Sequence, residues 1–265
     1  MRRLGLLAVL AGCGRLGFDS GAPRDDAEQG IPGDSRNLTD ATLIDVVPLD
    51  GPFPAGLKIW LPFDDAPQNT ADVVSGGNGR CTSPGCPSAI AGHHGNAFLF
   101  DGNDDCIEVP DSGQFGQSQL TAMIWFRQDA SDSCSPMGKR VDINGGSVVN
   151  SWELETNTSN QTVFTSSHGT SGNQRIFSPN NAITLTQWHH IALTYDGATK
   201  RMYIDGTERI FGAQTGAIAY DTHSAWFGCD DNSTSFVLFC KMAIDDFQLY
   251  DRALTPSEIM AIASQ

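Results

Sequence analysis

Two glutamates separated by one residue, Glu153 and Glu155, have the residue type and spacing that acid–base chemistry needs. Residues two apart on a β-strand share a face, so their carboxyl groups would lie roughly 6 to 7 Å apart. Carboxyl pairs at such separations cleave glycosidic bonds, one acting as acid and the other as nucleophile or base. The same two residues can also line a solvated sheet face without doing chemistry, and this is the interpretation that we favour.

Histidines occur as two adjacent pairs, His93 with His94 and His189 with His190. Neighbouring residues on a strand point to opposite faces, so we expect neither pair to share one metal ion or to act in acid–base catalysis. The sequence also lacks a G-x-S-x-G elbow, a Walker loop and a dinucleotide fingerprint. It therefore predicts no catalytic residue.

The N-terminus resembles the signal sequence of a bacterial lipoprotein. Arg2 and Arg3 precede a short apolar run at residues 4–10, which is followed by Ala11, Gly12 and Cys13. A helix needs roughly 20 apolar residues to span a bilayer, so a cleaved export signal fits this run better than an anchor. The resemblance to a lipobox implies that residues 1–12 are a signal peptide and that Cys13 is lipidated. We expect a lipid-anchored protein of the bacterial cell envelope, at the outer membrane or the cell surface.

The chain is strongly acidic, with a formal net charge of −15 that becomes −17 once Arg2 and Arg3 leave with the signal peptide. Such a charge repels nucleic acid and anionic membrane surfaces, so the lipid alone is expected to hold the protein at the membrane. Residues 13–52 are rich in Asp, Gly, Pro and Ser, a composition that buries too little apolar surface to fold. We interpret them as the lipidated N-terminus and a disordered acidic linker.

Seven cysteines become an even set of six once Cys13 carries lipid, which fits disulfides in an oxidising compartment. None forms the C-x-x-C pair that is typical of zinc sites. Six cysteines allow 15 pairings, and the sequence does not choose among them. Short spacings favour Cys81 with Cys86 and Cys229 with Cys240, and Cys106 with Cys134 follows by elimination.

We interpret residues 53–265 as one domain built from short strands. Runs such as 120–126, 190–195 and 243–250 are rich in β-branched and aromatic residues, and Asp-Gly pairs separate many of them. The one convincing helix start is Thr255 to Glu258, a capping box with Pro256 at the first helical position. The pattern predicts an all-β, antiparallel two-sheet sandwich with a short C-terminal helix.

Five segments of this domain resemble, in order, the laminin-G-like jelly roll of the concanavalin A-like lectin and glucanase superfamily. They are GLKIWLPFD at 56–64, HGNAFLFDG at 94–102 with EVPD at 108–111, LTAMIWF at 120–126, WHHIALTYDG with MYIDG at 188–206, and IDDFQLYDRAL at 244–254. The resemblance covers nearly all of residues 53–265 and implies a jelly roll with Phe98, Phe100 and Trp188 in its core. Glucanases of this fold carry an E-x-D-x-x-E strand, whereas Thr156, Asn157 and Thr158 follow Glu155 here.

The resemblance therefore implies a non-catalytic module that recognises carbohydrate or protein, with a glycan or an envelope or extracellular protein as partner. The alternatives are a structural envelope component with a protein partner and, less favoured, a glycoside hydrolase. Trp152, Trp226 and Tyr220 are eligible to stack on sugar rings, although we favour a core or cross-strand position for each of them. The ligand-binding residues remain unassigned.

The family often carries a structural calcium ion, and the resemblance extends to residues that could hold one. They are Asp64, Asp72, Asn78 and Asp245. Calcium takes six to eight oxygen ligands, which acidic loops and backbone carbonyls supply. We expect the four residues to lie close together because the first and last strands of such sandwiches pair.

Overall fold

The computed structural model describes residues 53–82 and 84–265. The predicted signal peptide, the predicted lipidation site Cys13 and the predicted linker lie outside these residues. No helix in the described part of the chain is long and apolar enough to cross a membrane.

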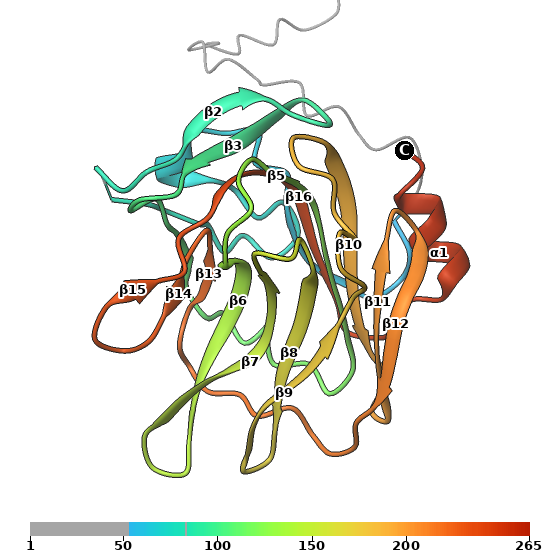
Figure 1. Ribbon diagram of the computed structural model, residues 1–265. Helices are drawn as coiled ribbons and strands as arrows, with labels where there is room; N and C mark the ends of the chain where they lie inside the picture. Colours follow the sequence, from blue (N-terminus) through green and yellow to red (C-terminus); the bar gives the residue numbers. More distant parts are fainter. Residues whose placement is uncertain (1–52, 83) are drawn as a thin grey trace, which may run out of the picture. The chain divides into compact units, whose positions relative to one another are not determined.

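Two antiparallel sheets make up the fold (Figure 1). The eight-stranded sheet has the order β12 (Thr207–Ala213), β11 (Thr199–Ile204), β10 (Trp188–Tyr195), β5 (Leu120–Gln128), β16 (Lys241–Tyr250), β3 (Asn96–Asp101) and β2 (Ser88–Ala91), and β1 (Leu57–Leu61) also pairs with β16. The six-stranded sheet has the order β4 (Ile107–Val109), β13 (Ala225–Phe227), β6 (Cys134–Ile143), β7 (Ser147–Thr156), β8 (Thr162–His168) and β9 (Ser171–Phe177). A two-stranded hairpin joins β14 (Asp230–Asp231) to β15 (Phe236–Val237), and a 3-10 turn, η1, spans Pro67–Asn69. The predicted all-β sandwich is confirmed.

The main core lies between the two sheets and follows the period of two that the strands show in sequence. In β10, Ile191, Leu193 and Tyr195 point inward, as their alternation predicts. Phe98 and Phe100 of β3 are fully buried there, as expected. Trp188 was wrongly expected in this core: it is half-buried, and the Arg127 guanidinium lies 5.5 Å from its ring centroid.

A second, smaller core lies on the other face of the eight-stranded sheet, where the helix α1 (Pro256–Ile262) packs. Ile259 and Ile262 of the helix cover Tyr203 and Tyr250 of the sheet. The predicted capping box is present, because the Thr255 hydroxyl accepts from the Glu258 N–H and the Glu258 carboxylate accepts from the Thr255 N–H. The sheet is therefore buried on both faces where the helix packs.

Three disulfides link the six cysteines of the domain. Of the three predicted pairings, only that of Cys81 with Cys86 is confirmed. The other two predicted pairings are wrong: the bonds are Cys106–Cys229 and Cys134–Cys240. Cys106 and Cys229 flank β4 and β13, which are neighbours in the six-stranded sheet although far apart in sequence.

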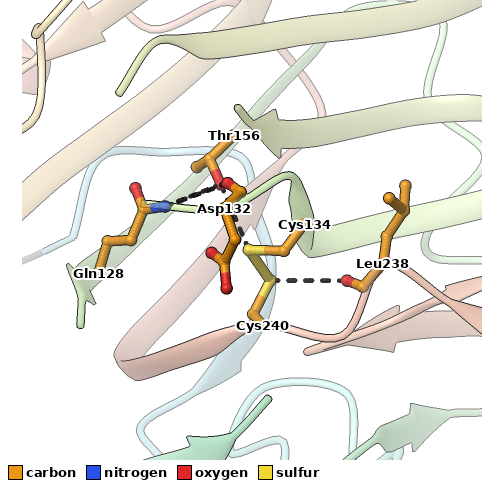
Figure 2. The surroundings of a disulfide bond; sticks show 6 residues. All are labelled: Gln128, Asp132, Cys134, Thr156, Leu238 and Cys240. Atoms are coloured by element: carbon orange, nitrogen blue, oxygen red, sulfur yellow. Dashed lines mark hydrogen bonds between the residues drawn. A yellow bond between two sulfur atoms is a disulfide. The ribbon is translucent and has the colours of Figure 1, made fainter. Parts of the chain in front are cut away.

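The bond between Cys134 and Cys240 joins β6 of one sheet to the chain just before β16 of the other (Figure 2). Beside it, the Thr156 hydroxyl accepts a hydrogen bond from the Gln128 amide at 3.3 Å, which adds a polar link between β7 and β5. The prediction from sequence spacing was wrong for the Cys106 and Cys134 bonds because strand order in the sandwich departs from chain order.

Candidate functional site

The outer face of the six-stranded sheet carries the two glutamates. In β7, Trp152 and Leu154 point into the core, so Glu153 and Glu155 share the opposite face, as predicted. The Asn150 amide donates to Glu153 Oε2 at 2.6 Å. Glu155 instead pairs with Arg175 of β9, with the guanidinium nitrogen 3.1 Å from Oε1.

Glu153 is only 1% exposed, and its Oε1 atom has no hydrogen-bond partner among the described residues. Burial raises the pKa of this carboxyl well above its ordinary value, and the charges of Glu155 and Asp230 add to the effect. A carboxyl group so enclosed does not meet a polysaccharide at the surface. The pair therefore lacks the accessible acid that glycoside hydrolysis requires.

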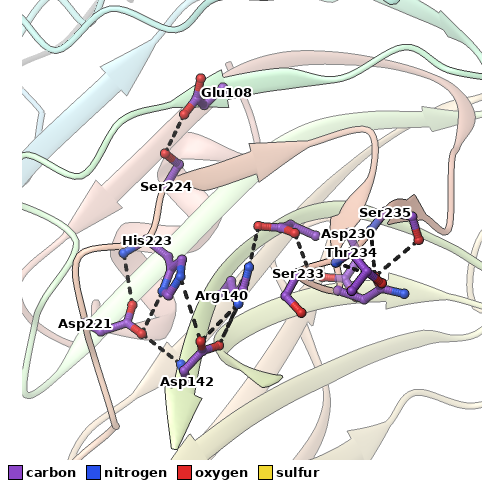
Figure 3. Close-up of polar contacts among 12 residues, drawn as sticks. Glu108, Arg140, Asp142, Asp221, His223, Ser224, Asp230, Ser233, Thr234 and Ser235 are labelled. Carbon is purple, nitrogen blue, oxygen red and sulfur yellow. Dashed lines mark hydrogen bonds and ion pairs between the residues drawn. The ribbon is translucent and has the colours of Figure 1, made fainter. Parts of the chain in front are cut away.

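The β14–β15 hairpin borders this face through a network of ion pairs (Figure 3). Arg140 of β6 lies 2.9 Å from Asp142 and 2.9 Å from Asp231 of the hairpin. Asp142 also lies beside His223, whose Nδ1 donates to Asp221 at 2.7 Å. These contacts fix the hairpin and the loop before β13 against the sheet.

A pocket of about 190 Å³ opens next to the hairpin, at the β4 edge of the same sheet. Trp226 of β13 and Phe236 of β15 form its aromatic wall, with ring centroids 4.6 Å apart. The Arg80 guanidinium lines the pocket and lies 3.0 Å from Glu108 Oε2. The other lining residues come from the two disulfide-bonded segments nearby: Cys81, Thr82, Gly85, Asp104 and Cys106.

Of the three aromatic residues considered for sugar stacking, only Trp226 lines this pocket. Trp152 is fully buried in the core. Tyr220 packs against the core, and its hydroxyl donates to the Gln117 carbonyl at 2.9 Å. The Trp226 indole N–H has no acceptor among the described residues. Phe236 and Arg80 were missed from the sequence, because only the pairing of distant strands brings them beside Trp226.

The four predicted calcium ligands divide into two groups. Asp64 and Asp245 reach the same tight turn at residues 92–95, since Asp64 accepts from the Asn96 N–H at 2.7 Å and Asp245 accepts from the His94 N–H at 2.9 Å. Gly95 in this turn has φ +47°, and a Cβ there would lie 2.2 Å from an Asp64 oxygen, so only glycine fits.

Asp72 and Asn78 lie in a separate loop. The Asp72 carboxylate accepts hydrogen bonds from Trp60, Val74 and Ser75, so it already serves as the cap of a turn. The Asn78 side chain donates to another side chain of the same loop at 3.2 Å. The fold thus assembles two of the four predicted residues at one place, and calcium binding stays a prediction.

Two histidines join Asp245 at the 92–95 turn, although the sequence analysis discounted them. His94 Nδ1 donates to Asp246 Oδ2 at 2.7 Å, and His93 Nδ1 lies 3.4 Å from His94 Nδ1. The hydrogen bond to Asp246 raises the pKa of His94, whereas burial lowers the pKa of His93. The alternation expected for strand residues does not apply to His93 and His94, because both lie in the turn between β2 and β3.

Comparison with known proteins supports this architecture. A sequence model described as the concanavalin A-like lectin/glucanases superfamily matches residues 101–260. No curated protein matches the chain closely enough to count as a relative.

Solved structures with low sequence identity share the fold. The binding domain of Paraclostridial Mosquitocidal Protein 1 aligns with a TM-score of 0.62 at 15% identity, over 78% of this chain and 52% of that one, so the chain spans about half of its length. Domain 4 of AbnA, an extracellular arabinanase from Geobacillus stearothermophilus solved with arabinotriose, aligns with a TM-score of 0.59 at 19% identity, over 78% and 98%. A Trypanosoma rangeli sialidase aligns with a TM-score of 0.59 at 16% identity, over 79% of this chain and 33% of the enzyme.

Proposed function

Because the chain belongs to the concanavalin A-like lectin/glucanase superfamily, we propose that it is a carbohydrate-binding protein whose ligand site is the pocket lined by Trp226 and Phe236. The observation that carries the proposal is one pocket that combines an aromatic wall with a guanidinium and a carboxylate. Aromatic faces stack on the apolar faces of sugar rings, and planar charged groups hydrogen-bond to neighbouring hydroxyls.

The size of the pocket limits what it holds. Drug-sized ligands occupy pockets of roughly 300 Å³ or more. A volume of about 190 Å³ therefore suits a single sugar unit or the end of a longer glycan. The arabinotriose in domain 4 of AbnA supports this proposal, since that domain has the same fold.

The proposed function is recognition without cleavage. Glu153 is enclosed beneath the sheet surface, and Glu155 is paired with Arg175, so neither glutamate has the surroundings of a working acid or nucleophile. The proposal also includes a lipid at Cys13, which would hold the domain on the cell envelope. The lipidation part rests on the resemblance of the N-terminus to a lipobox.

A glycan array tests the proposed function. We expect the purified Cys13→Ser protein to bind a defined class of sugars, and Trp226→Ala to lose binding by at least tenfold because the stacking surface is gone. Phe211→Ala is the matched control, since this exposed aromatic lies on β12 of the other sheet, away from the pocket.

If Trp226→Ala binds the sugar as tightly as Phe211→Ala and the unmutated protein do, the glycan binds elsewhere on the domain. A blank array would favour a protein partner instead. Release of reducing sugar by the unmutated protein would contradict the non-catalytic part of the proposal.

A further inference from the structure

We propose that the glycan recognised by this domain carries free amino groups, and that a second pocket, lined by aspartates, binds one of its ammonium groups. This inference rests on the proposed function, since it names the class of sugar that the site takes. The second pocket has a volume of about 430 Å³ and adjoins the Trp226 pocket, because Asp104 lines both. The disulfide loop of Cys81 and Cys86 borders the two pockets, with Cys81 lining the first and Cys86 the second.

The second pocket lies where β3 ends and β16 begins. Asp101 is the last residue of β3, and the exposed Lys241 is the first residue of β16. Pro84 and Leu99 add apolar surface to the lining. Its volume falls within the range of roughly 300–1,000 Å³ that organic ligands occupy, so the pocket has room for a sugar unit and its substituents.

The charge of the second pocket is negative, because four carboxylates and one ammonium line it. Asp129 is paired with Arg127, whose guanidinium nitrogen lies 2.9 Å from its Oδ2. One carboxylate oxygen each of Asp101, Asp104 and Asp105 lies within 4.8 Å of the others, and none of the three forms an ion pair in the described part of the chain. Like charges held so close repel one another, and a bound cation relieves the repulsion.

Asp105 supplies an independent observation that points to a cationic ligand. It is 6% exposed and lines the pocket. Its Oδ2 accepts from the Asp101 N–H at 2.8 Å, whereas no donor among the described residues reaches Oδ1. Burial raises the pKa of Asp105, and the charges of Asp101 and Asp104 add to the effect. A buried carboxylate oxygen without a donor is costly, and an ammonium group would both donate to it and offset its charge.

The free acceptors suit an ammonium group better than a metal ion. The Asp101 carboxylate already accepts from the N–H and the side-chain amide of Asn103, at 2.8 Å each. The carboxylates of Asp104 and Asp105 remain, and they are fewer than the six to eight oxygen ligands that calcium takes. A primary ammonium group needs acceptors for only three N–H groups. The two pockets together therefore suit an amino sugar joined to a sugar unit that stacks on Trp226.

Calorimetric titration of the Cys13→Ser protein with two matched oligosaccharides tests the inference. One probe is a glucosamine trimer with free amines, and the other is the same trimer N-acetylated, both at about pH 6, where the amines are charged. We expect the free-amine trimer to bind at least tenfold more tightly, because hydrogen bonds between charged groups are the stronger ones. The difference should shrink as sodium chloride rises from about 50 to about 500 mM, since salt screens the attraction.

Two variants locate the effect in the second pocket. Asp104→Asn removes one carboxylate and keeps the size of the side chain, and it should reduce the preference for the free-amine trimer roughly threefold or more. Asp196→Asn is the matched control, because it changes the net charge equally at the other end of the sheet. Asp196 follows the strand residue that pairs with the start of β5, whereas Asp129 of the pocket follows the end of β5.

Several results would overturn the inference. If the two trimers bind equally and Trp226→Ala weakens both, the inference fails and the proposed function stands. If neither trimer binds, the inference fails and the glycan array decides the proposed function separately. A preference that falls equally in Asp104→Asn and Asp196→Asn would show general attraction to an acidic protein instead. Tighter binding of a lysine trimer would assign the pocket to a protein partner.

Discussion

At the scale of single residues, the sandwich encloses two lysines that differ in whether a carboxylate lies beside the ammonium group. Lys200 of β11 is 1% exposed, and its ammonium donates to the Gln174 and Phe164 carbonyls at 2.5 and 3.4 Å. Lys139 of β6 is also buried, but its ammonium has Asp111 Oδ1 at 3.3 Å. Within residues 53–82 and 84–265, Lys200 lacks the ion pair that Lys139 has, and burial lowers the pKa of Lys200 to about 8.

This difference predicts a pH dependence of stability. A pKa that falls from 10.5 to about 8 corresponds to a cost of about 3 kcal/mol while the amine is charged in the folded protein. The unfolded chain binds more protons than the folded one between pH 8 and 10.5, so this lysine makes stability rise with pH in that window. Lys200→Met should abolish that rise, as urea unfolding at pH 7 and pH 10 would measure.

At pH 7 the same variant should change the free energy of unfolding little, because two lost charge-assisted hydrogen bonds of about 1.5 kcal/mol each offset the relieved cost of about 3 kcal/mol. Lys241→Met is the control, because the Lys241 side chain is exposed. A Lys200→Met protein that is clearly less stable at pH 7 would show that the two carbonyl contacts outweigh the desolvation.

At the scale of elements, the C-terminal helix is short and depends on its caps and on the sheet beneath it. Its seven residues are too few to be stable alone. Arg252 anchors the first turn by a contact of 2.6 Å to Glu258, and Ile259 and Ile262 bury the apolar face on Tyr203 and Tyr250. The helix thereby closes one face of the eight-stranded sheet.

Removing the cap tests this dependence. Thr255→Ala deletes the hydroxyl that accepts from the Glu258 N–H, and we expect a loss of about 1 kcal/mol of unfolding free energy. Thr255→Ser, which keeps the hydroxyl, should stay within a few tenths of the unmutated protein. Thermal unfolding of both variants measures the difference, and equal losses would show that the hydroxyl is not the stabilising group.

At the scale of the whole molecule, the disulfides differ in how much of the chain they constrain. Cys134–Cys240 joins the two sheets and closes a separation of 106 residues, whereas Cys81–Cys86 closes only 5. Because Cys106–Cys229 stays closed, Cys134–Cys240 closes a loop of about 40 residues, and chain entropy predicts roughly 4 kcal/mol of stabilisation for it and roughly 2 kcal/mol for Cys81–Cys86.

Paired alanine variants measure these contributions. The Cys134→Ala, Cys240→Ala protein should lose about 2 kcal/mol more stability than the Cys81→Ala, Cys86→Ala protein in denaturant titrations without reductant. Similar losses for the two proteins would mean that the long bond does not constrain the unfolded chain as chain entropy requires.

Sequence alone determined the features that depend on local periodicity. The alternation in β10, the capping box at Thr255 and the shared face of Glu153 and Glu155 follow from backbone geometry that neighbouring residues fix. For the same reason the sandwich class and the terminal helix were predictable.

Tertiary structure decided which distant residues meet. It paired Cys106 with Cys229, brought Arg80 and Phe236 to Trp226, and engaged the Asp72 carboxylate with the Trp60 N–H. Strand order in a sandwich is set by packing over the whole core, and the sequence spacing of two residues does not encode it. The turn at His93 and His94 shows the same limit, because its geometry is fixed by contacts with Asp245 and Asp246 from the other end of the chain.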